Sequence, residues 1–253
     1  MTTGRLVASD LRVSFGSTVA LEGLSIDVAP GEVVALIGAN GTGKSTFLRV
    51  VAGLLRPDRG SVTLGGDPIT GPDPRIGLVF QEPRLLPWRS VAANVAWPLE
   101  LAGWPADRRR ARVAELIALV GLEGSEGRRP SHLSGGMRQR AALARSVALS
   151  PDVLLLDEPF SALDALTRER LNLELLAIQA RTGTSVVLVT HSIPEAILLA
   201  DRVVVLTPPP GRVAAIVPID VPRPRSLATL DSAFVSAAAA AIRRHLDTPA
   251  VAA

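Results

Sequence analysis

The stretch that decides the fold is Gly38-Ala39-Asn40-Gly41-Thr42-Gly43-Lys44-Ser45-Thr46. An apolar run at residues 33–37 precedes it, and this run predicts a buried parallel strand. Residues 47–53 follow with helical spacing and end in a glycine. A strand, the pattern G-x-x-x-x-G-K-S and a helix are together the context that a phosphate-binding P-loop requires. The alternative, a glycine-rich turn with a chance lysine, is disfavoured by the strand and helix on either side.

The residue types in this loop suit phosphate chemistry. Gly38, Gly41 and Gly43 can adopt backbone angles that aim successive N–H groups into one concavity, and the helix N-terminus adds a partial positive charge. We expect Lys44 to reach the β- and γ-phosphates of a nucleotide and the Ser45 hydroxyl to ligate Mg²⁺. Lys44 is also the only lysine in the chain. Because ammonium and guanidinium groups are not interchangeable in a tight phosphate site, a single lysine at this position of an arginine-rich chain indicates a specific need for an ammonium group.

Length and composition limit the class of protein. The 253 residues fit one α/β domain, which we expect to span residues 4–246. The net charge is only +3, and the basic runs at residues 108–110 and 128–129 are short and lack interleaved aromatic residues, so we expect no nucleic-acid partner. The chain has no apolar stretch of the roughly 18 residues that a membrane helix requires, no signal-peptide core and no cysteine. We therefore expect a cytoplasmic protein without disulfides.

Apolar periodicity predicts an α/β fold with N-terminal antiparallel strands and an inserted helical subdomain. The predicted strands are residues 6–13, 19–28, 33–37, 61–64, 76–80, 153–156, 186–189, 203–206 and 212–219. Helical spacing predominates at residues 85–149, and this insert should form the subdomain. Further helices are predicted at residues 166–180 and, after a proline-rich segment, at 232–245, so that residues 207–246 form a C-terminal appendage.

A second cluster suited to phosphate chemistry follows the strand at residues 153–156. Asp157 and Glu158 stand at the carboxyl end of this strand, which is the edge where open α/β sheets bind ligands. Neighbouring side chains at a strand end point in different directions, so one carboxylate can face Mg²⁺ and the other a water molecule. Asp157 suits the metal and Glu158 the general base. Two acids that merely cap a strand are common, but this interpretation is weak beside a P-loop.

The most specific stretch is residues 133–140, LSGGMRQR. A serine and two glycines at a helix start make a second anion site from a hydroxyl, backbone N–H groups and the helix dipole. The chain here resembles the ATP-binding subunits of ABC transporters, whose signature is Leu-Ser-Gly-Gly-x-x-Gln-Arg, and the resemblance extends over nearly the whole chain.

The resemblance implies roles for other residues. Phe15 stands where the family stacks an aromatic ring on adenine, although tyrosine is more usual there. Gln81 falls at the family's glutamine loop, which contacts Mg²⁺ and relays motion to the membrane subunit. His191 matches the switch histidine that touches the γ-phosphate. Residues 161–164, SALD, match the loop that contacts the other ATPase subunit across the dimer.

One departure concerns the residues after this histidine. Many relatives place aspartate directly after it, whereas this chain has Ser192. Ser192 and Glu195 have the spacing of a capping box, and Pro194 falls in the first helical turn, where proline is tolerated. We expect the local geometry to be kept.

The resemblance also implies a head-to-tail homodimer that sandwiches two ATP molecules, each P-loop facing the signature of the other chain. Glu158 would polarise the attacking water while Lys44, His191 and Mg²⁺ stabilise the developing charge. The expected catalytic residues are Glu158, His191, Lys44 and Gln81; the expected nucleotide contacts are Phe15, Gly38, Asn40, Gly41, Gly43, Lys44, Ser45, Thr46, Ser134, Gly135, Gly136 and Asp164; the expected metal ligands are Ser45, Gln81 and Asp157.

Within the family, the segment at residues 81–91 is similar to that of the nitrate, sulfonate and taurine importers. Leu85, Leu86 and Trp88 would form an apolar anchor for transmembrane permease subunits, with a solute-binding protein as an indirect partner on the far side. A place in the subdomain core is the alternative for each of the two leucines. The ATPase would then lie on the inner face of the cell membrane. An exporter subunit, a soluble ABC ATPase of DNA repair or translation, and an unrelated P-loop kinase are the alternatives. The single cassette, the absence of sustained heptads and the signature disfavour the last two.

Overall fold

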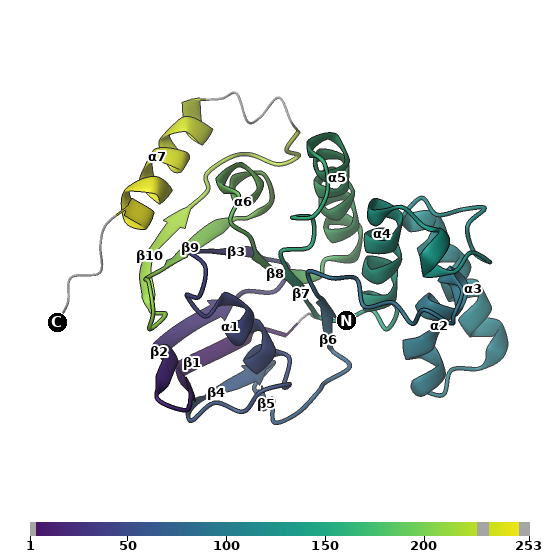
Figure 1. Cartoon of the computed structure of the whole chain (residues 1–253), viewed down its shortest axis with the longest axis horizontal. Coiled ribbons are helices and arrows are strands. Elements are labelled where there is room, and N and C mark those ends of the chain that lie inside the picture. The colour runs from purple at the N-terminus through teal and green to yellow at the C-terminus, as the bar shows by residue number, and fades with distance from the viewer. Residues whose placement is uncertain (1–3, 227–232, 248–253) are drawn as a thin grey trace.

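The computed structural model describes residues 4–226 and 233–247 and contains two β-sheets (Figure 1). The smaller sheet is antiparallel and has the strand order β2-β1-β4-β5. Its strands are β1 (Leu6–Phe15), β2 (Thr18–Val28), β4 (Arg59–Leu64) and β5 (Asp67–Pro68). The larger sheet has the order β10-β9-β3-β8-β7-β6. Its strands are β3 (Val33–Ile37), β6 (Ile76–Val79), β7 (Val153–Asp157), β8 (Ser185–Val189), β9 (Arg202–Leu206) and β10 (Val213–Pro218).

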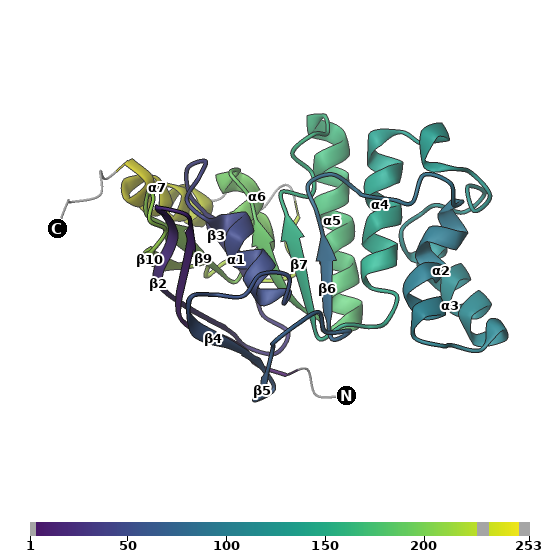
Figure 2. The same ribbon diagram turned by 60° about the horizontal axis from the view of Figure 1, so that its bottom comes forward.

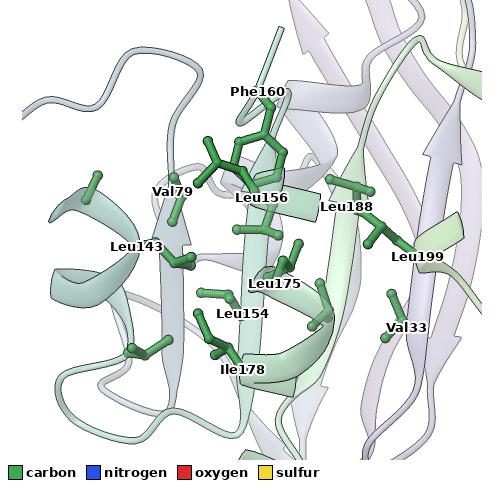
Figure 3. Packing of buried hydrophobic residues seen from close by; sticks show 14 of the residues in the cluster. Val33, Val79, Leu143, Leu154, Leu156, Phe160, Leu175, Ile178, Leu188 and Leu199 are labelled. Atoms are coloured by element: carbon green, nitrogen blue, oxygen red, sulfur yellow. The ribbon is translucent and has the colours of Figure 1, made fainter. Parts of the chain in front are cut away.

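The larger sheet is parallel except at one edge, where β10 pairs antiparallel with β9. Its central strands are apolar at nearly every position because both faces are covered. On β7, Leu154 and Leu156 enter one core while Val153 and Leu155 enter the other. Figure 3 shows the first of these cores between the sheet and its helices. Strict alternation along each strand therefore serves two apolar layers at once.

Different helices cover the two faces. Helix α1 (Lys44–Val51) shares a core with the antiparallel sheet, whereas α5 (Ala165–Thr182) and α6 (Ile193–Leu199) pack on the opposite face. The helices α2 (Val91–Leu101), α3 (Ala106–Leu119) and α4 (Gly135–Ser146) lie together beyond α5, at one end of the molecule (Figures 1 and 2). A short 3-10 helix, η1 (Pro130–His132), precedes α4. Among the described residues, none of the helices is both long and apolar enough to cross a membrane.

Several element boundaries differ from those predicted. The P-loop helix begins at Lys44 rather than residue 47, because the polar residues of the loop itself form its first turn. The strand predicted at residues 61–64 is β4, and it begins two residues earlier, at Arg59. The predicted terminal helix is α7 (Ala233–Asp247), packed against α6, β9 and β10; its predicted first residue, Ser232, lies outside the described residues, as do residues 227–231 of the predicted C-terminal appendage.

One buried arginine fastens the C-terminal segment to the core. Arg225 is only 7% exposed, and its guanidinium donates to carbonyls at the end of α6 and in the segment after β10. The acceptors are the carbonyl oxygens of Ile197, Leu198, Ala200, Ile219 and Val221. The last carbonyls of a helix have no partner within the helix, so this side chain satisfies groups that would otherwise be buried without a donor.

Replacing Arg225 with methionine should lower the free energy of unfolding by roughly 2–4 kcal/mol, because several buried carbonyls lose their donor at once. Urea unfolding measures the change. Arg243→Met on the exposed face of α7 is the matched control. Equal stability of the two variants would contradict this account of the segment.

Candidate nucleotide site

Four parallel strands end at the same edge of the larger sheet, and each carries a predicted site segment beyond its carboxyl end. The P-loop follows β3, Gln81 follows β6, and Glu158 and His191 follow β7 and β8. Because these strands are neighbours in the order β3-β8-β7-β6, the four segments converge at one place, as expected for an open parallel sheet. Two backbone hydrogen bonds fix the strand ends: Glu158 donates to the Val189 carbonyl, and Thr190 to the Leu36 carbonyl.

The glycines of the P-loop are required for two different reasons. Gly41 and Gly43 have φ angles of +82° and +85°, which side chains disfavour. A Cβ on Gly43 would also lie 2.5 Å from the Leu21 side chain. Gly38 is different from the prediction, since it does not adopt a positive φ; a Cβ there would lie 2.9 Å from Thr42 Oγ1. Glycine is needed at this position because a side chain would block the close packing of Gly38 against Thr42 of the same loop.

Lys44 lies in the concavity of this loop. Its side chain is almost fully buried, and its Nζ donates to the carbonyl oxygens of Gly38 and Ala39 at 2.8 and 2.9 Å. Burial lowers the pKa of Lys44, and the nearby carboxylates of Glu158 and Asp157 act in the opposite direction. The ammonium group is therefore held at the loop by two carbonyl dipoles and two carboxylates.

Ser45 and Asp157 form a pair of oxygen groups beneath the loop. Ser45 Oγ donates to Asp157 Oδ1 at 2.9 Å. Burial raises the pKa of Asp157, while the Ser45 hydrogen bond lowers it. Within the described residues no three His, Cys, Asp or Glu side chains gather as metal ligands. One carboxylate and one hydroxyl nevertheless fit Mg²⁺, which takes few protein oxygens and completes its shell with phosphate oxygens and water.

Glu158 and His191 face each other across the ends of β7 and β8. Glu158 Oε2 lies 3.1 Å from His191 Nδ1. Glu158 has a φ of +43°, an uncommon value for a residue with a side chain. Such strain persists only where the surrounding structure enforces it, and it is concentrated at functional sites. Here the hydrogen bond from the Glu158 N–H to the Val189 carbonyl holds the end of β7 against the end of β8, and the Glu158 carboxylate lies beside His191.

Gln81 reaches the same strand end through Ser161, a residue for which the resemblance implies only a contact with the other subunit. Gln81 Nε2 donates to Ser161 Oγ at 3.2 Å, and Ser161 Oγ donates to the Glu158 carbonyl at 3.1 Å. A serine three residues after Glu158 is the only sequence signal for this link.

An open hollow of about 760 Å³ is lined by most of these groups, although Gly38 and Asp157 are not among its lining residues. Its lining contains the predicted residues that the fold brings together, with Ala20 as the one addition: Phe15, Ala20, Asn40, Gly41, Gly43, Lys44, Ser45, Thr46, Gln81, Glu158 and His191. Phe15 is half exposed. The hollow is therefore a polar site with one exposed aromatic ring.

The signature serine lies elsewhere. Among the described residues that line the hollow, Ser134, Gly135, Gly136 and Asp164 are not found. Ser134 is exposed, and its Oγ caps α4 by accepting from the Met137 N–H at 3.3 Å. Figures 1 and 2 both place α4 on the far side of β6 and β7 from α1. A single chain thus presents the hollow and the signature as two separate surfaces.

Asp164 belongs with the signature rather than with the hollow. It caps α5 by accepting from the Thr167 N–H at 3.0 Å. A Cβ on Gly136 would lie 3.0 Å from Thr167 Cγ2, and one on Gly135 would lie 3.2 Å from Leu163 Cδ2. The start of α4 therefore packs closely against the start of α5, and only glycine fits there without displacement.

A P-loop lysine, a hydroxyl-carboxylate pair and a carboxylate-histidine pair around one hollow define a P-loop nucleotide hydrolase.

Comparison with known proteins identifies the family. The family profile described as ABC transporter matches residues 21–161. The chain is 49% identical over 219 residues to the aliphatic sulfonates import ATP-binding protein SsuB 2 of Burkholderia lata, covering 85% of this chain and 79% of that protein. It is 51% identical over 212 residues to SsuB 1 of Xanthomonas axonopodis pv. citri, covering 83% and 84%. The chain therefore belongs to the ABC transporter family and is one of its ATP-hydrolysing subunits.

A solved structure agrees with this assignment. It is a dimeric ATP-binding cassette in a post-hydrolysis state with ADP and Pi bound, and it matches with a TM-score of 0.75 at 30% sequence identity. The match covers 85% of this chain and 98% of that chain. The predicted ABC ATPase fold is thus confirmed.

Proposed function

We propose that two copies of this chain bind two ATP molecules head to tail and drive import of a small solute through a separate permease. The observation that carries the proposal is the separation of the hollow from Ser134, because each chain then offers half of a site and needs the other half from a partner. The solved dimer with ADP and Pi supports the same arrangement. Residues 4–246 would form one ATPase domain, with residues 85–149 as its helical subdomain.

In the closed dimer, different residues of this chain would bind the phosphates, contact the adenine and activate the attacking water. The P-loop N–H groups and Lys44 bind the phosphates, and Phe15 stacks on the adenine. Glu158 accepts the proton of the attacking water, held in place by His191, which also faces the γ-phosphate. Mg²⁺, when bound by Ser45 and Asp157 with Gln81 beside them, would supply positive charge to offset the charge on the phosphates.

The signature of the other chain would complete the site. Ser134, Gly135 and Gly136 present a hydroxyl, free N–H groups and a helix start to the γ-phosphate. Asp164 would contact the partner across the interface. The phosphates are then enclosed between the two chains, which raises the strength of each charge interaction by excluding water.

The segment at residues 81–91 would receive the permease. Trp88 is 68% exposed, whereas Leu85 packs on the core. Leu86 lines a groove of about 350 Å³ with Trp97 and Leu149. An exposed tryptophan is a typical interface anchor. The three predicted anchor residues thus separate into one that supports the core and two that are available to a partner.

The relatives' names guide the choice of solute and location. SsuB proteins are named for aliphatic sulfonates, so we propose a small solute, either a sulfonate such as taurine or a similar solute such as nitrate, delivered by a solute-binding protein. The ATPase would sit on the cytoplasmic face of the cell membrane. The names give no support to the alternative of a soluble ATPase in DNA repair or translation.

A tagged pull-down from detergent-solubilised native membranes tests the proposal. The wild-type chain should recover a multi-span permease, and Trp88→Ala should lose most of it because the anchor is removed. Phe234→Ala is the matched control, since Phe234 is 67% exposed on α7 at the other end of the molecule (Figure 1). Recovery of only ribosomal or DNA-repair proteins by the wild type would refute the transporter function.

A further inference from the structure

Glu195 is a buried carboxyl group to which the proposed mechanism gives no task. It lies in the first turn of α6, four residues after His191, and it is only 6% exposed. Its Oε2 accepts a hydrogen bond from Thr190 Oγ1. Its Oε1 has no hydrogen-bond partner among the residues that the structure describes. Because burying a polar group without a partner costs free energy, this arrangement needs an explanation.

The contacts of Glu195 enclose the histidine from both sides. Thr190 precedes His191 and is bound by the Glu195 carboxyl. Ser192 follows it; its Oγ accepts from the Glu195 N–H at 3.4 Å, and its own N–H donates to Thr190 Oγ1 at 3.0 Å. Only half of the predicted capping box is present, since the carboxyl binds Thr190 instead of the Ser192 N–H. Glu195 therefore fixes both neighbours of His191 while leaving its ring exposed.

The opposite side of Glu195 faces α5. Asn172 is 4% exposed, and its Oδ1 likewise has no partner within the described ranges 4–226 and 233–247. Arg168, one turn earlier, donates to the carbonyls of Phe160 and Leu163 at 3.2 and 2.8 Å. These carbonyls belong to the turn that follows Glu158. Glu195 thus stands between the loop of His191 and the helix that holds the loop of Glu158.

Burial favours the protonated form of the Glu195 carboxyl group. Burial raises the pKa of Glu195, against the opposing effects of Thr190, Arg168, Asn172 and His191. Arg168 and His191 are the charged or titratable groups that act on it. The Asn172 amide can donate to a carboxylate or accept from a neutral carboxyl group, so it can serve Glu195 in either form. Glu195 therefore lies between Thr190 at the end of β8 and Asn172 on α5.

We propose that Glu195 is a positioning residue for hydrolysis, holding His191 at the distance from Glu158 at which the two side chains act together. This inference rests on the roles proposed above for Glu158 and His191. It predicts that damage at Glu195 acts on turnover through His191, whereas ATP binding, which belongs to the P-loop, is spared.

Steady-state hydrolysis tests the proposal with three variants. Glu195→Ala should lower kcat roughly 10- to 100-fold, because a displacement of about 1 Å can cost that much, with KM for ATP changed little. Glu195→Gln should restore most of kcat, since its amide can accept from Thr190 and donate to Asn172. Glu123→Ala, which removes an exposed glutamate, is the control. A kcat of Glu195→Ala equal to that control, or an equal loss in Glu195→Gln, would overturn the proposal.

A double-mutant cycle with His191→Ala separates positioning from general damage. If Glu195 acts through His191, adding Glu195→Ala to His191→Ala should reduce kcat no further; independent multiplication of the two losses would refute the inference alone. Unchanged kcat in His191→Ala by itself would instead refute the proposed role of the histidine. Should Glu195→Ala fail to fold, Thr190→Val removes the bridging hydroxyl at nearly constant volume and should lower kcat in the same way, again only when His191 is present; an unaffected Thr190→Val would refute the inference.

Discussion

Glu158→Gln should bind ATP and form the dimer but hydrolyse ATP roughly 100- to 10,000-fold more slowly than the wild type, the range expected when a general base is removed. Glutamine keeps the size of the side chain and can still face His191 Nδ1, now 3.1 Å from Glu158 Oε2. Its amide cannot accept the proton of the attacking water. Phosphate release measures turnover, and gel filtration with and without ATP measures dimer formation.

Glu123→Gln on an exposed position is the control for this variant. The ATP-bound Glu158→Gln dimer also tests whether Ser134 of one chain completes the hollow of the other. A dimer that forms with ATP in Glu158→Gln, and dissociates when ATP is removed, is expected if the signature of one chain completes the site of the other. Hydrolysis at the wild-type rate would remove Glu158 from the role of base.

The local part of the site is predictable because short patterns determine it. An apolar run of five residues, a glycine-rich loop and a helix are together the pattern of a phosphate-binding loop, and the strand end at residue 157 places two acids at a known edge of the sheet. These features depend on neighbours in the sequence. The structure accordingly places the P-loop, Glu158 and His191 around one hollow, as the sequence predicts.

The rest depends on contacts between distant segments. Nothing in residues 76–80 indicates that Gln81 will meet Ser161, because this contact follows from the pairing of β6 with β7. Likewise, Ser192 and Glu195 have capping-box spacing, yet the Glu195 carboxyl group binds the hydroxyl of Thr190 at the end of β8. The spacing of residues in the sequence predicts one hydrogen-bond partner, whereas tertiary packing can bring a different partner closer.

Replacing Lys44 with arginine should weaken ATP binding at least about 30-fold, a loss of roughly 2 kcal/mol, although the charge is kept. The Nζ lies 2.8 and 2.9 Å from two carbonyl oxygens of the loop, in a position that is 6% exposed. A guanidinium group is planar and larger than an ammonium group, so it cannot enter the same concavity without displacing the loop. Titration with a fluorescent ATP analogue measures the affinity.

Two comparisons distinguish shape from charge at this position. Lys44→Met removes the charge at similar length; a similar loss in both variants means that the loop needs a compact ammonium and gains nothing from a misplaced cation. Arg56→Lys, an exchange at an exposed position, should bind ATP like the wild type and shows that the two cations are equivalent in solvent. Full affinity in Lys44→Arg would contradict the fit described here. Every other Lys or Arg position in the chain is arginine. The single lysine stands where the P-loop backbone encloses the cation.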